Sequence, residues 1–264
     1  MDYQKVTAIY FSPTGHTAQY AVRLAGLLGG NTADVDLTRR ENRDRQLHFS
    51  KNDLVILGAP VYGGRLPGLP GQPLFSNLQG DNTPAILLVT YGNRHYDDAL
   101  LELADLAREK GFIPVAGAAL LARHTNSVKI GGDRPDAADW EAFAQAAAAL
   151  KARLEGIGEA DGLRDSLSVP GNRPYRASRK NVFFPQADSR CTRCGKCVQV
   201  CPTGAISADH LEGADLSLCI NCAACVHQCP EGARAFREDA FWEKVHMLEQ
   251  KCGPVRREAE WYLV

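Results

Sequence analysis

Residues 5–17 read KVTAIYFSPTGHT, and this stretch determines the architecture of the first half of the chain. Residues 5–11 form a short apolar, β-rich run, which a turn containing Pro13 and Gly15 follows. Residues 18–28, AQYAVRLAGLL, then show the apolar spacing of an amphipathic helix. The stretch predicts a strand, a tight loop and a helix in immediate succession.

The same alternation of strands and helices continues to about residue 155. Near-continuous apolar runs, as expected of strands buried on both faces, occur at 53–58 (DLVILG), 85–90 (AILLVT) and 113–120 (IPVAGAAL). A shorter run at 33–37 is typical of an edge strand, and helices are expected at 97–111 and about 136–155. The pattern predicts an α/β domain with a doubly wound, five-stranded parallel sheet that helices cover on both faces.

The length and charge of the chain limit its range of functions. Its 264 residues suit a domain of about 150 residues and a smaller second domain. Thirty Lys and Arg against 31 Asp and Glu give a formal net charge of -1, so no basic field favours nucleic acid. The N-terminus lacks the apolar core of a signal peptide, and no run of about 18 apolar residues occurs. We therefore expect a cytoplasmic protein with no nucleic-acid or membrane partner.

Eight of the nine cysteines form two matching repeats at a constant offset of 28 residues, CTRCGKCVQVCPTGA from Cys191 and CINCAACVHQCPEGA from Cys219. The spacing C-x2-C-x2-C-x3-C-P is typical of bacterial proteins that hold two [4Fe-4S] clusters, in which the fourth cysteine of each repeat serves the other cluster. The alternative is zinc, although its ribbons separate two C-x2-C pairs by a longer stretch. The ninth cysteine, Cys252, lies outside both repeats. The predicted ligands are Cys191, Cys194, Cys197 and Cys229 for one cluster, and Cys219, Cys222, Cys225 and Cys201 for the other.

These patterns divide the chain into four segments. The α/β domain spans 1–155, and the domain with the cysteine repeats spans 188–237. Residues 156–187 between them are rich in Gly, Pro, Arg and Ser. They are either a solvated connector or a basic strap that docks one domain on the other. Residues 238–264 are predicted to be a helical tail, with an amphipathic helix at 238–250.

The loop between the first strand and the first helix is a candidate phosphate site. Hydroxyls and backbone amides at a helix N-terminus bind a phosphate through the aligned peptide dipoles. The loop has no lysine, which excludes a Walker P-loop, and no G-x-G-x-x-G motif follows a strand elsewhere. The alternative is a simple helix cap.

This loop, S-x-T-G-x-T, resembles the FMN-phosphate loop of flavodoxins. The resemblance implies phosphate contacts from Ser12, Thr14, Gly15, His16 and Thr17. In flavodoxins, the loops after the third and fourth strands enclose the isoalloxazine ring, with an aromatic side chain against it; here they are residues 59–67 and 90–98. Tyr62, Tyr91 and Tyr96 are the candidate rings, unless they only cap the sheet. The other flavin contacts expected from these loops are Ala59, Pro60, Val61, Gly63, Thr90, Gly92, Asn93 and Asp97.

The whole chain resembles bacterial flavodoxin-ferredoxin fusion proteins of the EFR type. The resemblance implies a flavodoxin-like sheet of order 2-1-3-4-5, a smaller α+β ferredoxin-like domain, FMN, two [4Fe-4S] clusters and electron transfer. The first functional hypothesis is therefore electron transfer between the clusters and FMN, with a redox protein as donor or acceptor.

Two other functions stay open. One is an FMN-dependent reductase of a small-molecule acceptor, in which His95 and Tyr96 are the catalytic candidates and Arg65 could bind an anion. The other is a redox module or sensor in a larger complex. The sequence leaves a homodimer, the physiological partners and the direction of electron flow open.

Overall fold

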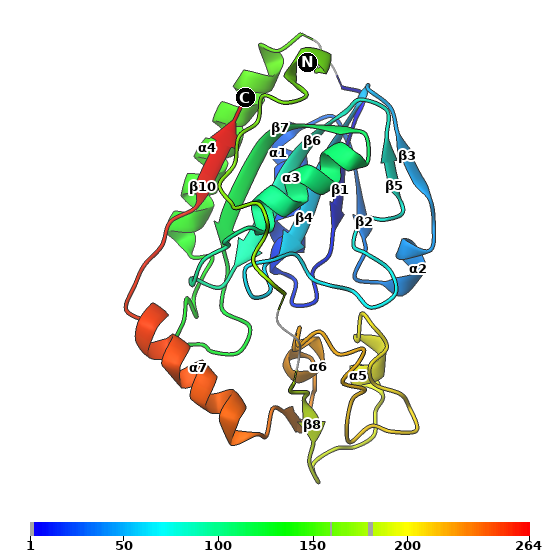
Figure 1. Cartoon of the computed structure of the whole chain (residues 1–264), viewed down its shortest axis with the longest axis vertical. Coiled ribbons are helices and arrows are strands. Elements are labelled where there is room, and N and C mark those ends of the chain that lie inside the picture. Colours follow the sequence, from blue (N-terminus) through cyan, green and yellow to red (C-terminus); the bar gives the residue numbers. More distant parts are fainter. Residues whose placement is uncertain (1–2, 159, 179–181) are drawn as a thin grey trace.

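A sheet with helices on both faces forms the larger part of the molecule, in a computed structural model that describes residues 3–158, 160–178 and 182–264 (Figure 1). The sheet has the strand order β2-β1-β4-β6-β7-β10. Its first five strands are parallel and the last is antiparallel. The strands are β1 (Lys5–Tyr10), β2 (Asn31–Asp36), β4 (Asp53–Pro60), β6 (Thr83–Tyr91), β7 (Phe112–Leu121) and β10 (Glu260–Leu263). The α/β, doubly wound fold class is confirmed.

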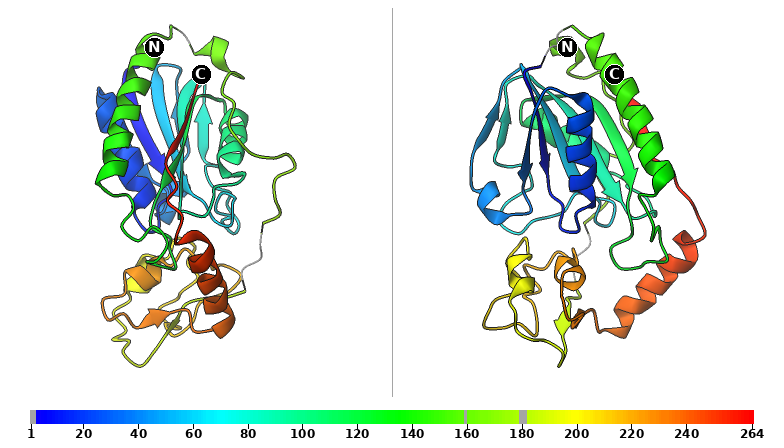
Figure 2. Two further views of the ribbon diagram at one scale, coloured as in Figure 1. Left: turned by 90° about the vertical axis from the view of Figure 1, so that its left-hand side faces the viewer. Right: turned by 180° about the vertical axis from the view of Figure 1, so that it is seen from behind.

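Apolar side chains explain why the sheet is covered on both sides. Every residue of β6 and β7 is buried, as their continuous apolar runs require. Helices α1 (His16–Leu28) and α4 (Ala137–Glu155) cover one face, and α3 (Ala99–Glu109) covers the other (Figure 2). None of the helices in the described residues is long and apolar enough to cross a membrane. We call residues 3–155 together with β10 the sheet domain.

Short elements complete the sheet domain. Strands β3 (Leu47–Phe49) and β5 (Leu78–Gly80) pair in a separate two-stranded ribbon beside α2 (Arg40–Arg43), and a 3-10 turn, η1 (Asp161–Leu163), follows α4.

The C-terminal segment differs from the predicted helical tail. Helix α7 (Asp239–Cys252) is close to its expected position, but β10 then pairs antiparallel with β7 at the edge of the sheet. The ring centroid of Trp261 in β10 lies 5.7 Å from that of Phe143 in α4. The prediction missed this strand because EWYL is too short to show a period. The domain with the cysteine repeats is thus inserted before the last strand of the sheet.

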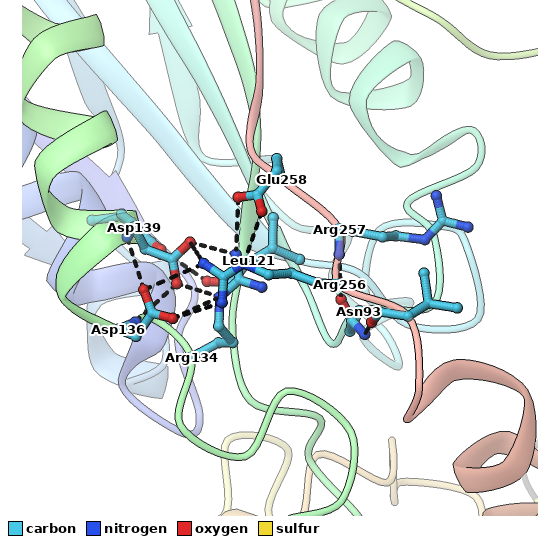
Figure 3. A network of polar contacts seen from close by, with 10 residues as sticks. Asn93, Leu121, Arg134, Asp136, Asp139, Arg256, Arg257 and Glu258 are labelled. Atoms are coloured by element: carbon cyan, nitrogen blue, oxygen red, sulfur yellow. Dashed lines mark hydrogen bonds and ion pairs between the residues drawn. The ribbon is translucent and has the colours of Figure 1, made fainter.

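A polar network fastens the segment between α7 and β10 to the sheet domain (Figure 3). The Arg256 guanidinium donates to Asp136 at 2.8 Å, at the N-terminus of α4. Buried Arg134 forms a two-pronged ion pair with Asp139, and its guanidinium lies 3.6 Å from Glu258. The chain entering β10 is therefore held by charged groups as well as by strand pairing.

The cysteine domain, residues 182–237, lies against the edge of the sheet where the parallel strands end (Figure 1). It contains a short antiparallel pair, β8 (Gln186–Ala187) and β9 (Arg234–Ala235), and two single-turn helices, α5 (Lys196–Gln199) and α6 (Ala224–His227). The 28-residue repeat is visible in the backbone, because residues at matching positions share left-handed conformations. The matching pairs are Arg193 and Asn221, Gly195 and Ala223, and Gly204 and Gly232.

Part of the linker docks on α3. The Asn172 and Arg176 amides donate to Asp98 at 2.9 and 2.7 Å, while Arg173 and Tyr175 bond to Asp105. This favours the strap hypothesis for residues 172–176, with the sheet domain as the docking surface. The expectation for residues 179–181 lies outside the described residues.

Candidate functional site

The loop after β1 presents backbone amides at the start of α1. Ser12 Oγ accepts a hydrogen bond from an amide of the first helical turn at 3.0 Å. Gly15, with a φ of 88°, has the left-handed conformation that turns the chain into the helix. Within the described residues, the amides of Thr14, His16 and Thr17 have no hydrogen-bond partner. Three donors are thus available to an anion at this helix end.

His16 adds a side-chain donor to this loop. Its Nδ1 is buried without a partner among the described residues. Burial, and then the nearby Arg123 and His227, lower the pKa of His16, which keeps the ring neutral. A buried nitrogen left without a partner beside free amides fits the phosphate of FMN. Thr17 instead uses its hydroxyl in a 2.6 Å hydrogen bond with Thr90 at the end of β6.

The loop after β4 turns sharply at two glycines. Tyr62 and Arg65 exchange backbone hydrogen bonds of 2.9 and 3.2 Å across Gly63 and Gly64, both of which have positive φ. Ala59 and Pro60 are the last residues of β4, so they precede the turn. Burial, and secondarily Cys222 of the cysteine domain, raise the pKa of the Tyr62 hydroxyl well above its ordinary value.

The structure does not support Tyr96 as a stacking ring or a proton donor. Its side chain is only 2% exposed, and its hydroxyl bonds to Glu260 at 2.8 Å and to the Tyr262 hydroxyl at 2.7 Å. Tyr91 is also buried, with its ring centroid 5.5 Å from that of Tyr96. Nothing in the sequence indicated these hydrogen bonds, because the partners of Tyr96 in β10 are far away along the chain.

Asn93 also has a different role from the predicted flavin contact. Its side-chain amide, 3% exposed, donates to Cys252 O at 3.0 Å and to Val255 O at 2.5 Å. Its Oδ1 accepts from the Arg257 amide at 3.2 Å (Figure 3). The side chain therefore anchors the C-terminal segment and leaves no donor for a cofactor.

His95 and Asp97 are held in a charged loop. The Asp97 amide donates to His95 Nδ1 at 2.8 Å, so His95 Nε2 is the ring nitrogen left for a ligand. The Asp97 carboxylate pairs with both Arg94 and Arg176, and Arg176 comes from the strap. His95 thus remains a candidate for orientation or proton transfer, while Asp97 joins the loop to the strap.

A cavity of about 590 Å³ lies beside these loops. Its volume is within the range of small-molecule sites. Val61, Gly63, Tyr91, Gly92 and His95 are among the residues that line it on the sheet-domain side, and Arg176 of the strap, α7 and the segment after α7 also line it. The cavity is therefore bounded by the flavin loops and by a segment that sequence reasoning did not connect with the site.

The first cysteine quartet lines one cavity. Cys191, Cys194, Cys197 and Cys229 all line it, so three thiols of the first repeat meet one of the second. Cys194 is exposed and the other three are partly buried. This cavity opens toward solvent at Cys194.

The second quartet lines a separate cavity. Cys201, Cys219, Cys222 and Cys225 all line it, so three thiols of the second repeat meet one of the first. Cys222 and Cys225 are buried, and burial raises the pKa of Cys225 to about 11. Buried thiolates need a positive partner, which the irons of a cluster would supply. Among the described residues, no three potential ligands are close enough to hold a single metal ion, and both quartets surround cavities instead.

Arg234 lies between the two quartets, and sequence reasoning missed it. Its side chain is buried, and its guanidinium donates to the carbonyl oxygens of Pro185, Leu211 and Gly213. Its Nη1 lies 4.0 Å from Cys197 Sγ of the first quartet, and its charge also acts on Cys225 of the second. Within the described residues it has no carboxylate partner. The signal was present in the repeat, because Arg234 stands where the first repeat has the apolar Ile206.

The second quartet is the one that meets the sheet domain. Ile220, between two of its cysteines, packs against the apolar core on the α3 side of the sheet. His227 Nε2 lies 2.8 Å from Thr125 O, and Arg43 Nη2 donates to Pro202 O at 2.5 Å. The domain interface therefore places this quartet beside the end of the sheet that carries the candidate flavin loops.

Three family models match the chain. The model described as a flavodoxin domain matches residues 7–69, and two models described as 4Fe-4S binding domains match residues 188–207 and 216–232. The flavodoxin match covers β1, the phosphate loop and the loop after β4, and the other two cover the cysteine repeats. The chain thus combines a flavodoxin domain, which implies FMN, with two 4Fe-4S binding segments, which imply iron–sulfur clusters.

Several solved structures are similar to the sheet domain. Two-electron reduced Megasphaera elsdenii flavodoxin is 17% identical, with a TM-score of 0.36 over 55% of this chain and 98% of the flavodoxin. Streptococcus pneumoniae flavodoxin is 16% identical, with a TM-score of 0.35 over 56% and 99%. A Bacteroides uniformis flavoprotein is 18% identical, with a TM-score of 0.35 over 46% and 93%. No curated protein matches the chain.

Proposed function

We propose that the protein transfers electrons between two [4Fe-4S] clusters and FMN within one chain. One cluster is held by each cysteine quartet, and the FMN phosphate is bound at the loop after β1. The irons take up one electron at a time, and the flavin supplies a carrier for one or two. Fusion keeps these cofactors at a high effective concentration, so transfer needs no diffusional encounter.

The observation that carries the proposal is the interface between the two domains. Ile220, between two cysteines of the second quartet, packs on the core of the sheet domain, and Arg43 Nη2 donates to Pro202 O at 2.5 Å. The loops after β4 and β6, where a flavin ring is expected, lie at the same end of the sheet. The second cluster would therefore be the one next to the flavin.

The exposure of the cysteines supports an order of transfer. Cys194 of the first quartet is exposed, while Cys222 and Cys225 of the second are buried. An external redox protein would therefore exchange electrons with the first cluster, and the second cluster would connect it to the flavin.

The test follows flavin and cluster absorbance after rapid anaerobic reduction of the full-length holoprotein by a one-electron donor. We expect the clusters to be reduced first, and the flavin then to be reduced at a rate that does not depend on protein concentration. Cys222→Ala should slow flavin reduction at least about tenfold, because it disrupts the connecting cluster. Cys252→Ala is the matched control, since Cys252 is buried outside both quartets.

Two results would overturn the proposal. One is a wild-type protein whose clusters are reduced while the flavin stays oxidised. The other is flavin reduction in Cys222→Ala at the wild-type rate. If Cys222→Ala assembles poorly, the wild-type protein alone tests the proposal, through the dependence of its flavin reduction rate on protein concentration.

The cavity beside the flavin loops favours a second candidate function, reduction of a small molecule. In that case the flavin would deliver the electrons received from the clusters to an acceptor bound in the cavity. His95 would then be the proton donor. The Asp97 amide bonds to its Nδ1, which leaves Nε2 for the acceptor. Repeated turnover of an added acceptor that is lost in His95→Gln, with flavin content unchanged, would support this function.

A further inference from the structure

The cavity beside the flavin loops has a strongly cationic lining. Four permanent cations line it, and Asp97 is the one carboxylate among its lining residues. The cations are Arg94, Arg176, Lys251 and Arg257. Three of them come from the strap and the C-terminal segment, which lie outside the α/β core. The charge of the cavity is therefore a property of the fused chain.

Two of the four cations share one carboxylate. Arg94 and Arg176 both form ion pairs with Asp97. Within residues 3–158, 160–178 and 182–264, neither Lys251 nor Arg257 has a carboxylate partner. The Arg257 guanidinium extends away from the network around Arg134 (Figure 3). Lys251 and Arg257 are thus the two lining cations without a carboxylate partner in the described part of the chain.

The acidic residues nearest in sequence are engaged elsewhere. Glu249 binds the Ser127 hydroxyl at 2.7 Å and a lysine at 3.1 Å. Glu258 pairs with Arg256 at 2.8 Å, and Glu260 accepts from two tyrosine hydroxyls. These carboxylates could not turn to the cavity without losing their own partners. Lys251 is exposed and Arg257 is partly buried, so both charges stay available to an anion that enters the cavity from solvent.

We infer that this cavity binds a small organic molecule with two negative charges, a dicarboxylate or a phosphate monoester, through Lys251 and Arg257. An arginine fork and a lysine ammonium suit carboxylate and phosphate oxygens alike. Val61 and Gly63 line this cavity, whereas the cysteines of the second quartet line a separate one. The anion would therefore lie apart from the second quartet. The inference rests on the proposed function in one respect: it assumes that the flavin is bound between the loops after β4 and β6.

The test measures binding to the anaerobic holoprotein by isothermal titration calorimetry. The probes are succinate, inorganic phosphate and the uncharged succinamide. We expect one site for succinate or phosphate and none for succinamide; tighter binding of succinate indicates a carboxylate ligand, and tighter binding of phosphate a phosphate ester. Lys251→Gln and Arg257→Gln should each weaken binding by about tenfold, because each removes a charged contact. Lys51→Gln is the matched control, since exposed Lys51 lies in a turn before β4 and loses the same charge.

The inference is overturned if neither anion binds, or if both variants bind it as wild type does. It is also overturned if the two substitutions weaken FMN binding to the apoprotein while the holoprotein binds no anion, because the cations would then serve the cofactor. Electron transfer from clusters to flavin is measured on the same holoprotein. If the holoprotein binds the anion but its clusters do not reduce the flavin, the proposed function is wrong and the anion site stands.

Discussion

Replacing Arg234 should lower the reduction potentials of the clusters. Its buried guanidinium donates to three carbonyl oxygens and, at 4.0 Å, to Cys197 Sγ, and it acts on Cys225 of the other quartet. A cluster gains negative charge on reduction, so a nearby cation stabilises the reduced form. Arg234→Gln removes that charge, while Arg234→Lys keeps it.

The geometry sets the size of the effect. Unit charges 4 Å apart at an effective dielectric constant of about 20 interact by about 4 kcal/mol. A tenfold change in the equilibrium constant of a one-electron couple equals about 59 mV. The change in reduction potential caused by losing this charge is therefore at most about 170 mV. A cluster spreads its charge over all its atoms, so we expect a fall of about 50–100 mV in Arg234→Gln.

The assay is an anaerobic redox titration of both clusters, followed by electron paramagnetic resonance. Arg237→Gln is the control, because Arg237 is a partly exposed arginine that pairs with Asp188 in the same domain. The cluster reduction potentials should fall in Arg234→Gln and change much less in Arg234→Lys and Arg237→Gln. Unchanged potentials in a correctly loaded Arg234→Gln protein would refute the electrostatic role of this residue.

Three further predictions concern the flavin site and its supports. His16→Ala should weaken FMN binding to the apoprotein about tenfold and leave riboflavin binding nearly unchanged, as measured by flavin fluorescence, because His16 Nδ1 is expected to contact only the phosphate; an equal loss for both ligands would contradict this. Asn93→Ala should cost about 1–3 kcal/mol of unfolding free energy and speed amide exchange at residues 255–263, since Cys252 O and Val255 O lose their donor; unchanged exchange there would show that β10 pairing alone holds the segment. Asp98→Asn should cost about 2 kcal/mol at pH 7. Although burial opposes it, hydrogen bonds from Arg176 and Asn172 lower the pKa of Asp98, so this contribution is present above the ordinary value of 3.8 and is lost as the pH falls through the folded pKa. The difference between wild type and Asp98→Asn in urea unfolding should therefore shrink below about pH 4, and a constant difference would contradict the assignment.

Local patterns predicted much of this molecule. The strands β4, β6 and β7 are continuous apolar runs, so burial on both faces identified them. The cysteine spacing is equally local, because three ligands of a cluster come from one short loop. The phosphate loop was visible for the same reason, since it lies between β1 and α1 in an unbroken stretch.

Long-range partners explain what the sequence did not reveal. Asn93 and Tyr96 looked like flavin contacts, yet their partners are at Cys252, Val255 and Glu260, more than 150 residues later. Lys251 and Arg257 belong to no sequence motif that indicates a site. They reach the candidate flavin loops only because the chain returns to the sheet after the cysteine domain.

The return of the chain to the sheet also bears on biosynthesis. Strand β10 follows the cysteine domain in sequence, so a ribosome must make both repeats before the strand can cover the edge of β7. Until then that edge exposes unpaired peptide groups, which other chains could extend into aggregates. A chain cut after residue 237 would keep this liability permanently. The pairing of β10 with β7 is thus a late step, because it requires that the cysteine domain has already been synthesised.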